Sequence, residues 1–224
     1  MSNELFYRYY GGHGLDVVRN LRLKVTPLDR CNDPFECCPW FDYGGIPADD
    51  QSIQALIEEF GRSYGLICFT REGSNILMWS HYANGHKGIL IGFDPKHSFF
   101  QQHDWVDADY QTERTRFHPD LISTQAGKNE FAKELVSRNF TCWRYEKEFR
   151  ILKRLQECVP DGEQRFLEIP KELILSVTFG LGCLLEKREE ILVAMRDNGL
   201  KPQLQQARRH NKDFALIYEP ICAE

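Results

Sequence analysis

Residues 143–151 read Trp-Arg-Tyr-Glu-Lys-Glu-Phe-Arg-Ile, and this segment says most about the architecture of the chain. Its charged residues alternate with mainly aromatic or apolar ones, which predicts a β-strand because side chains alternate across a strand. The face that suits a core carries Trp143, Tyr145, Lys147, Phe149 and Ile151. The other face carries Glu146 and Glu148, roughly 7 Å apart. Arg144 and Arg150 flank this pair and would keep both carboxylates ionised.

The face with Glu146 and Glu148 allows two interpretations. A solvated strand face with surface ion pairs is the ordinary one for such a pattern. The neighbouring aromatic residues favour a buried setting instead, in which paired carboxylates can stabilise a sugar cation and activate a nucleophile. Both glutamates are therefore candidate catalytic residues.

The composition describes a folded chain with little general attraction to nucleic acid. Of the 224 residues, 42% are apolar and 27% are charged, which is enough for a sizeable core. The formal net charge of −5 predicts no general affinity for phosphate backbones. No apolar run is long enough to span a bilayer, and the N-terminal residues lack the features of a secretion signal. We therefore expect a cytoplasmic protein with no membrane partner, whose eight cysteines are mainly free buried thiols.

Short strands and helices are interspersed along the rest of the chain. Strands are predicted at residues 5–10, 65–70, 89–93 and 173–179, and helices at 52–60, 127–139 and 186–198. Neither a strict βαβ rhythm nor a linker is visible. The sequence predicts one domain over residues 1–224, of the α+β class, with a mixed, largely antiparallel sheet flanked by helices.

A second informative segment, residues 77–88, is rich in aromatic residues and histidine. Its aromatic residues are by default helix core. Ser80 and His81 are neighbours on a helix and point in different directions, so we do not expect them to form a nucleophile–base pair. His81 and His86 are five residues apart, which does not match the i, i+4 spacing of helical metal ligands. A structural role is the default for both histidines.

Residues 32–36 read Asn-Asp-Pro-Phe-Glu. Pro34 restricts the backbone, so the segment predicts a rigid turn. The same turn could place Asn32 or Glu36 at a site.

Arg8 stands inside an aromatic segment, Phe-Tyr-Arg-Tyr-Tyr at residues 6–10. Burying a guanidinium is costly unless an anion pairs with it. That anion would be Glu146, Glu148 or a ligand phosphate, and the sequence does not choose among them.

Together these segments resemble a widespread bacterial family known only as a domain of unknown function. Its pattern is a Tyr-Arg strand, an N-D-P-F-E loop, a C-F-[ST] strand leading to M-W-x-H-Y-A-x-x-H-x-G, and then W-x-Y-E-x-E-x-R. Here the motifs stand at residues 7–8, 32–36, 68–70, 78–88 and 143–150. The resemblance spans most of the chain to about Gly180, and by itself it implies no reaction.

The order of three of these elements also resembles the ADP-ribosyltransferases of the arginine–serine–glutamate class. The resemblance implies that Arg8 holds the pyrophosphate of NAD, and that Thr70 supports the first strand and the nicotinamide ribose. It implies that Glu148 binds a ribose hydroxyl and stabilises the oxocarbenium-like transition state, while Glu146 positions the acceptor. The chain departs from the class at residues 69–70, where only Phe-Thr stands in place of a Ser-Thr-Ser run.

From this resemblance we expect an ADP-ribosyltransferase-like enzyme that transfers ADP-ribose from NAD to an unidentified macromolecular acceptor. The expected setting is a toxin or a phage-defence effector. His81 and Tyr82 are further residues expected to contact NAD.

Two alternatives stay open. A metal-dependent phosphoester hydrolase or nuclease would hold a divalent ion through oxygen ligands, drawn from Asp33, Glu36, Glu146 and Glu148. A non-catalytic module would bind a nucleotide or a partner, with Arg8 and Glu146 as a structural ion pair.

Overall fold

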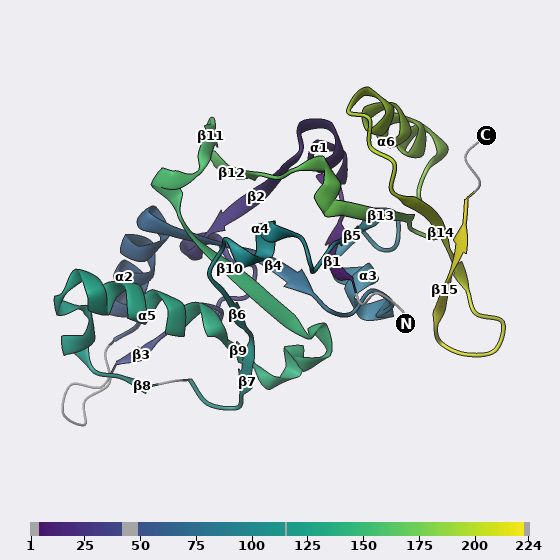
Figure 1. The fold of residues 1–224 in the computed structure, drawn as a ribbon. Helices are drawn as coiled ribbons and strands as arrows, with labels where there is room; N and C mark the ends of the chain where they lie inside the picture. The colour runs from purple at the N-terminus through teal and green to yellow at the C-terminus, as the bar shows by residue number, and fades with distance from the viewer. Residues whose placement is uncertain (1–4, 42–48, 115, 222–224) are drawn as a thin grey trace. The chain divides into compact units, whose positions relative to one another are not determined.

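A computed structural model describes residues 5–41, 49–114 and 116–221 of the chain. The chain divides into two compact units. Unit 1 comprises residues 1–23, 69–102 and 168–224, and unit 2 comprises residues 24–68 and 103–167. Each unit is built from segments that are far apart in the sequence, as the colours of Figure 1 indicate.

The sheet of unit 1 has the strand order β1-β5-β13-β14-β15 (Figure 1). These strands are β1 (Phe6–Tyr10), β5 (Ile89–Phe93), β13 (Ile174–Phe179), β14 (Gln203–Arg209) and β15 (Leu216–Pro220). Strand β5 is antiparallel to both β1 and β13, and β14 is antiparallel to β15. Strands β13 and β14 are parallel. In this register Arg8 lies opposite Ile91.

The helices of unit 1 are α1 (Gly14–Asn20), α3 (Ile76–Tyr82), α4 (Ser98–Gln101), α6 (Leu185–Asp197) and the short 3-10 helix η5 (Lys171–Leu173). Asn75 caps α3 by accepting hydrogen bonds from the Leu77 and Met78 amides. Helices α1 and α6 pack against each other. All five residues of β5 are buried, so this strand lies in the core of the unit.

Unit 2 contains two sets of strands. The larger set has the order β11-β12-β2-β4, with β10 paired to both β4 and β6. Its strands, which lie mainly in unit 2, are β2 (Arg22–Pro27), β4 (Tyr64–Thr70), β6 (Trp105–Asp107), β10 (Glu148–Arg154), β11 (Val159–Asp161) and β12 (Gln164–Glu168). The smaller set is two parallel pairs, β3 (Trp40–Phe41) with β8 (Arg116–Phe117), and β7 (Asp109–Gln111) with β9 (Arg138–Phe140).

The helices of unit 2 are α2 (Asp50–Ser63), α5 (Gln125–Ser137) and the 3-10 helices η1 (Leu28–Arg30), η2 (Pro119–Ser123), η3 (Thr141–Glu146) and η4 (Leu155–Glu157). Asp49 caps α2, and Thr124 caps α5. The core of the unit is built around Phe131, whose ring packs edge-to-face on Phe60 and Phe117 at centroid distances of 5.0 and 4.8 Å.

The predicted α+β class with a mixed, mostly antiparallel arrangement of strands is confirmed. The strand predicted at 89–93 is found with those bounds, and the helix predicted at 186–198 occurs as Leu185–Asp197. Gly199 follows that helix with a φ of +62°, as a C-terminal cap requires. The strand β2 was not predicted, because its residues Arg-Leu-Lys-Val-Thr-Pro follow directly on a helical segment without a glycine.

The strand predicted over residues 143–151 is wrong in its first half. Residues Thr141–Glu146 form the 3-10 helix η3, and β10 begins only at Glu148. Lys147, between them, has a left-handed backbone with a φ of +46°. Glu146 therefore does not share a strand face with Glu148, and strand alternation applies only from Glu148 onward.

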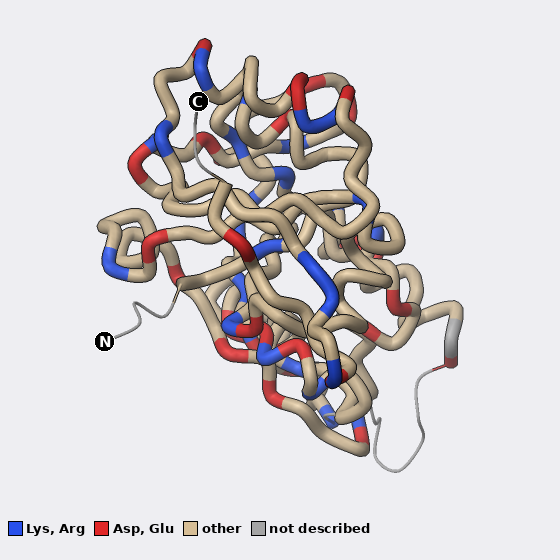
Figure 2. The backbone as a smooth tube through the Cα atoms, turned by 90° about the vertical axis from the view of Figure 1, so that its right-hand side faces the viewer, with Lys and Arg blue, Asp and Glu red and all other residues tan. Residues whose placement is uncertain are grey.

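Acidic and basic residues are interspersed along the backbone (Figure 2), in keeping with the small net charge of −5. Within the described residues, no helix combines the length and the apolar character needed to cross a bilayer.

Candidate functional site

The candidate site is a buried ion cluster in unit 2, centred on Arg150. The Arg150 side chain is 0% exposed, and its Nη2 lies 2.5 Å from Glu36 Oε1 and 2.7 Å from Glu148 Oε2. Its Nη1 donates hydrogen bonds to the carbonyl oxygens of Val136 (2.8 Å) and Arg138 (3.3 Å). A buried guanidinium of this kind is tolerable because anions and carbonyl oxygens replace its water.

The register of β10 explains why a charged residue is buried here. Glu148 and Arg150 are two residues apart on one face of the strand. Phe149 and Ile151 point to the other face and are also fully buried. Because both faces of β10 are covered, Arg150 has no route to water and depends on its two carboxylates.

The backbone turn at Lys147 ends η3, so that β10 begins at Glu148. The Lys147 amide donates to the Arg144 carbonyl oxygen at 3.3 Å, which closes the 3-10 turn. The Glu148 amide then donates to the Tyr110 hydroxyl at 2.8 Å. Burial raises the pKa of Tyr110 to about 12, so this hydroxyl is neutral at pH 7.

The Asn-Asp-Pro-Phe-Glu loop at residues 32–36 reaches the same cluster. Asp33 accepts hydrogen bonds from the Phe35 amide at 2.8 Å and from the indole Nε1 of Trp143 at 2.7 Å. The Glu36 amide donates to the Asp33 carbonyl oxygen at 3.0 Å. Two sequence motifs more than a hundred residues apart are thus one structural unit, and the loop is the element that delivers Glu36.

Burial and charge act unequally on the members of the cluster. Burial raises the pKa of the Glu36 carboxyl, and the negative charge of Glu148 raises it further, against the opposing effect of Arg150. Burial alone would lower the pKa of Arg150, but the attraction of Glu148 and Glu36 outweighs it, so Arg150 stays charged. One cation faces two carboxyl groups, and Glu36 is the group that accepts a proton more readily than an ordinary glutamate.

Thiols surround the cluster and are held in the neutral form. Burial and the neighbouring Glu148 charge raise the pKa of Cys68 well above its ordinary value. The pKa of Cys31 is also raised: a hydrogen bond with Cys37 is the largest cause, and burial is the second. Neutral thiols are poor nucleophiles and poor metal ligands, so these cysteines serve as packing groups. The described cysteines are free, as expected, but the expectation that they are mainly buried is wrong: Cys37 and Cys158 are buried, whereas the other described cysteines are half-buried or exposed.

A metal ion would have one place to bind among the described residues. Ligand atoms of Glu36, Cys68 and Glu148 lie within 4.8 Å of one another. Arg150 already contacts both carboxylates, and the Cys68 thiol favours its protonated form. The donor set therefore fits a divalent cation poorly while the guanidinium is in place.

Unit 2 contains a cavity of about 370 Å³ near the 32–36 loop. Phe35 and Cys37, the sequence neighbours of Glu36, line it together with Asp33, Arg138 and residues of the segment 111–114, whereas Glu36, Glu148 and Arg150 do not. The Glu36 and Glu148 side chains are 9% and 8% exposed, whereas Arg150 is not exposed at all. Both glutamate side chains are therefore nearly, though not completely, enclosed by protein.

The predicted residues of unit 1 form a separate group. Arg8 lies on β1 with its guanidinium carbon 5.3 Å from the Tyr10 ring centroid. Its Nη1 is buried, and no described residue hydrogen-bonds to it. Thr70 is buried, and its hydroxyl accepts from the Glu72 amide at 2.8 Å. His81 is exposed at the end of α3 and packs edge-on against Tyr82 at 6.2 Å.

Glu146 and Glu148, in contrast, belong to unit 2 and are both buried. Glu148 is joined to Arg150, and Glu146 ends η3. The sequence analysis named Glu36 as a residue that the 32–36 turn could place at a site, but it did not identify Arg150 as the centre of the cluster. The available signal was Arg150 itself, which stands between two apolar residues in the half of the segment that does form a strand.

His86 has a partner that local reasoning did not identify. Its Nε2 lies 3.1 Å from the Ser80 hydroxyl, and its ring stacks on Trp79 at 6.1 Å. Burial lowers the pKa of His86, which favours the neutral ring. Ser80 and His81, as expected, are not the interacting pair; the turn after α3 brings residue 86 back to residue 80.

Residues 78–151 match the model of a family described as "Protein of unknown function (DUF2971)". The expected resemblance to a domain-of-unknown-function family is confirmed. The matched segment contains both longer motifs, residues 78–88 and 143–150, and therefore Glu148 and Arg150. No curated protein and no solved structure matches the chain.

Proposed function

We propose that this chain is an ADP-ribosyltransferase-like enzyme that cleaves the nicotinamide–ribose bond of NAD and transfers ADP-ribose to an acceptor. The observation that carries the proposal is the pair of largely enclosed carboxylates, Glu36 and Glu148, that contact one nitrogen of Arg150; the loop that carries Glu36 lines a cavity. Two carboxyl groups held close together can serve a reaction through a sugar cation, one stabilising the cation and the other accepting a proton.

The proposed step breaks the bond between ribose C1′ and the nicotinamide nitrogen. The electron pair of this bond leaves with nicotinamide, which departs neutral, and positive charge develops on the ribose. An oxygen of the acceptor, or of water, then bonds to C1′ and loses its proton. The balance is NAD⁺ plus acceptor–H giving ADP-ribosyl acceptor, nicotinamide and H⁺.

In this scheme Glu148 stabilises the developing sugar cation. A carboxylate is most effective in this role when it is fixed before the charge develops. The bonds from Arg150 to the Glu148 side chain and from the Glu148 amide to Tyr110 support such fixation.

Glu36 is the proposed acceptor of the proton that the incoming oxygen loses. Its raised pKa supports this assignment, because a general base is most efficient when its pKa lies nearer the working pH. The same protonation would relieve the repulsion between Glu36 and Glu148 inside the cluster.

Arg8 is proposed to bind the pyrophosphate of NAD, as the resemblance implies. The buried Nη1, which has no hydrogen-bond partner among the described residues, supports this role, since a ligand phosphate would satisfy it. Thr70, His81, Tyr82 and Glu146 keep the roles expected from the sequence as parts of the same proposal.

Transfer of label from NAD carrying ³²P in the adenylate tests the proposal. Wild-type protein is incubated with labelled NAD and a cell extract as the source of acceptor. We expect label in acceptor macromolecules, reduced about a hundredfold for Glu148→Gln. Glu157→Gln is the matched control, because Glu157 lies in the same unit, is half exposed and forms only a surface contact with Lys153.

Melting curves of the variants separate a catalytic loss from an unfolded protein. Glu148→Gln keeps the size of the side chain and a hydrogen-bond acceptor for Arg150, so it should remain folded. Equal labelling by wild type and Glu148→Gln, or no NAD consumption by folded wild type in the presence of extract, would overturn the proposal.

A second candidate, a metal-dependent phosphoester hydrolase, is favoured by the convergence of Glu36, Cys68 and Glu148. It requires a metal ion to compete with Arg150 for both carboxylates. The two candidates differ in their response to Zn²⁺ and Mn²⁺. The transferase proposal predicts no change in melting temperature with these ions, whereas the hydrolase predicts stabilisation that Glu36→Gln abolishes.

A further inference from the structure

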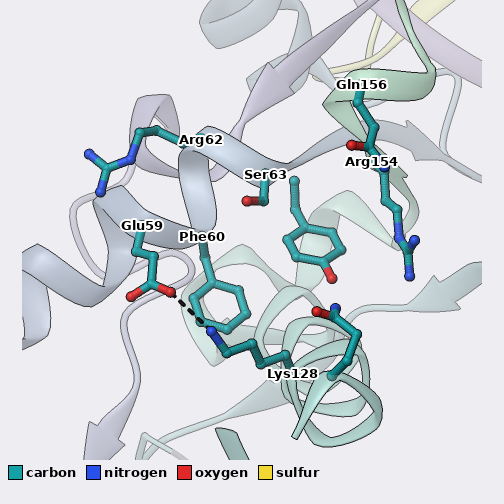
Figure 3. Close-up of a pocket in the computed structure, with 9 residues that line it drawn as sticks. Glu59, Phe60, Arg62, Ser63, Lys128, Arg154 and Gln156 are labelled. Carbon is teal, nitrogen blue, oxygen red and sulfur yellow. Dashed lines mark hydrogen bonds and ion pairs between the residues drawn. The ribbon is translucent and has the colours of Figure 1, made fainter. Parts of the chain in front are cut away.

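Unit 2 has a second concave site, which the proposed chemistry does not use. Its volume is about 300 Å³, at the small end of the range for ligand pockets. Figure 3 shows side chains of α2, of α5 and of the end of β10 arranged around it. The residues whose charges and contacts matter below are Glu59, Ser63, Lys128, Arg154 and Gln156.

The charge of this pocket is opposite to that of the whole chain. Arg62, Lys128 and Arg154 line it, with Glu59 as the acidic residue among the lining side chains. The chain as a whole has a net charge of −5. Three cations against one anion around a small concave volume create a local positive field, which the low-dielectric walls of the pocket strengthen.

Arg154 is held in place by an amide at the back of the pocket. Asn129 Oδ1 accepts hydrogen bonds from Arg154 Nη2 at 3.2 Å, from the Tyr64 hydroxyl at 2.6 Å and from Gln125 Nε2 at 3.2 Å. This contact uses one nitrogen of the guanidinium fork. A pre-organised guanidinium loses less entropy when an anion binds.

Lys128 is available for exchange onto an anion. It pairs with Glu59 at 3.1 Å, and the two side chains are 38% and 54% exposed (Figure 3). An ion pair so open to solvent contributes little free energy, so an anionic ligand can take the ammonium at small cost. Lys128 also lies in the first turn of α5, where the helix dipole favours negative charge.

The aromatic floor of the pocket adds a surface for the rest of the ligand. The rings of Phe60 and Tyr64 lie 5.9 Å apart at an angle of 20°. Both residues line the pocket. Ser63 and Gln156, at the exposed rim, add neutral hydrogen-bonding groups.

We propose that this pocket binds a small phosphorylated molecule, with Arg154 and Lys128 as the anchoring cations. The pocket is distinct from the Arg150 cluster, and the proposal does not depend on NAD chemistry. A phosphate fits the site because its three oxygens can accept from a guanidinium and an ammonium at once. The limited volume favours a small molecule over the backbone of a nucleic acid.

Calorimetric titration with inorganic pyrophosphate, in chloride buffer without other phosphates, tests the proposal. We expect saturable binding to wild-type protein, and about tenfold weaker binding to Lys128→Gln and to Arg154→Gln. Lys133→Gln is the matched control: Lys133 lies on the same helix and pairs with an acid, Asp104, at 2.9 Å, but it does not line the pocket. Its affinity should equal that of wild type.

The variant Gln156→Glu tests the pocket without a risk of misfolding. Gln156 is exposed, so the change removes no buried contact and adds one negative charge at the rim. We expect it to weaken pyrophosphate binding while leaving the melting temperature unchanged. Equal affinities for all variants, or no saturable binding up to about 10 mM, would overturn the proposal. Tighter binding of a single-stranded oligonucleotide than of pyrophosphate, lost in the same variants, would overturn the assignment to a small molecule.

Discussion

Arg150 in unit 2 is fully buried, whereas Arg8 in unit 1 is half-buried, and the two arginines have different partners. Arg150 contacts two carboxylates and two backbone carbonyl oxygens. Arg8 lies against the Tyr10 ring and has a buried Nη1 without a hydrogen-bond partner among the described residues. Arg150 Nε is likewise buried without a hydrogen-bond partner among the described residues, so the difference lies in the anions: two protein carboxylates contact Arg150, whereas Arg8 is proposed to bind a ligand phosphate.

The partners of the two arginines, rather than their exposure alone, therefore distinguish the two positions. Arg150 organises an acidic site by supplying the charge that lets Glu36 and Glu148 sit together. Among the described residues, Arg8 has a cation–π contact with Tyr10 and no hydrogen-bond partner for its Nη1. Variants at the two positions should therefore differ most in stability, and the predictions below are ordered by the size of that effect.

Arg150→Met should produce the largest loss of stability. Removing the cation leaves two buried carboxylates facing each other, which costs about 3–5 kcal/mol of unfolding free energy. Urea denaturation measures it. Arg144→Met, in the same motif but exposed, should change stability by less than about 0.5 kcal/mol. A partial recovery is expected when Glu36→Gln and Glu148→Gln are added to Arg150→Met; no recovery would show that Arg150 acts through packing alone.

Trp143→Phe should lower the free energy of unfolding by about 1–2 kcal/mol, because the Asp33 carboxylate loses the indole donor. A double-mutant cycle with Asp33→Asn isolates the contact. If the indole bond fixes the 32–36 loop, Trp143→Phe should cost clearly less in the Asp33→Asn background. Strictly additive losses would mean that the loop and η3 are held independently.

Arg8→Gln should change stability by less than about 1 kcal/mol, since it removes only a cation–π contact with Tyr10. NAD binding, measured by calorimetry, should nevertheless be lost. If Arg8 were instead a structural ion-pair partner, as a non-catalytic module requires, Arg8→Gln and Arg8→Ala would unfold the protein. Such unfolding would contradict the claim that Arg8, unlike Arg150, contributes little to stability.

The smallest predicted effect is the pH dependence contributed by Glu36. Its pKa is raised in the folded protein, chiefly by burial. The folded state therefore favours protonated Glu36. The contribution of Glu36 to stability is present at low pH and is lost as the pH rises through the raised pKa. The stability of Glu36→Gln relative to wild type should therefore improve between about pH 4 and pH 8. A relative stability that instead worsens with rising pH would mean that Arg150 dominates over burial.

The part of the site that could be predicted from the sequence is the part governed by local geometry. Glu148 and Arg150 are two residues apart in a true strand, so strand alternation places them on one face. Strand alternation does not apply to Glu146, because Lys147 adopts a left-handed backbone before the strand begins. Lysine carries no sequence signal for that conformation, which glycine and asparagine ordinarily mark.

The remaining features depend on contacts between distant segments. Glu36 reaches Arg150 because the 32–36 loop is fastened to η3, a contact over 110 positions that no local pattern encodes. The division into two units could not be predicted from a linker, because each unit combines several separate segments of the chain. The individual strands and helices could be recognised because each depends on the periodicity of its own residues.

Release of nicotinamide from NAD labelled in the nicotinamide ring tests the central claim most directly, because it registers bond cleavage with either water or an added acceptor. With wild type, Glu148→Gln and the surface control Glu157→Gln at equal folded concentration and with the same extract, the account predicts release by wild type and Glu157→Gln at the same rate. It predicts a rate about a hundredfold lower for Glu148→Gln. Equal rates for all three proteins, or no release by folded wild type, would contradict it.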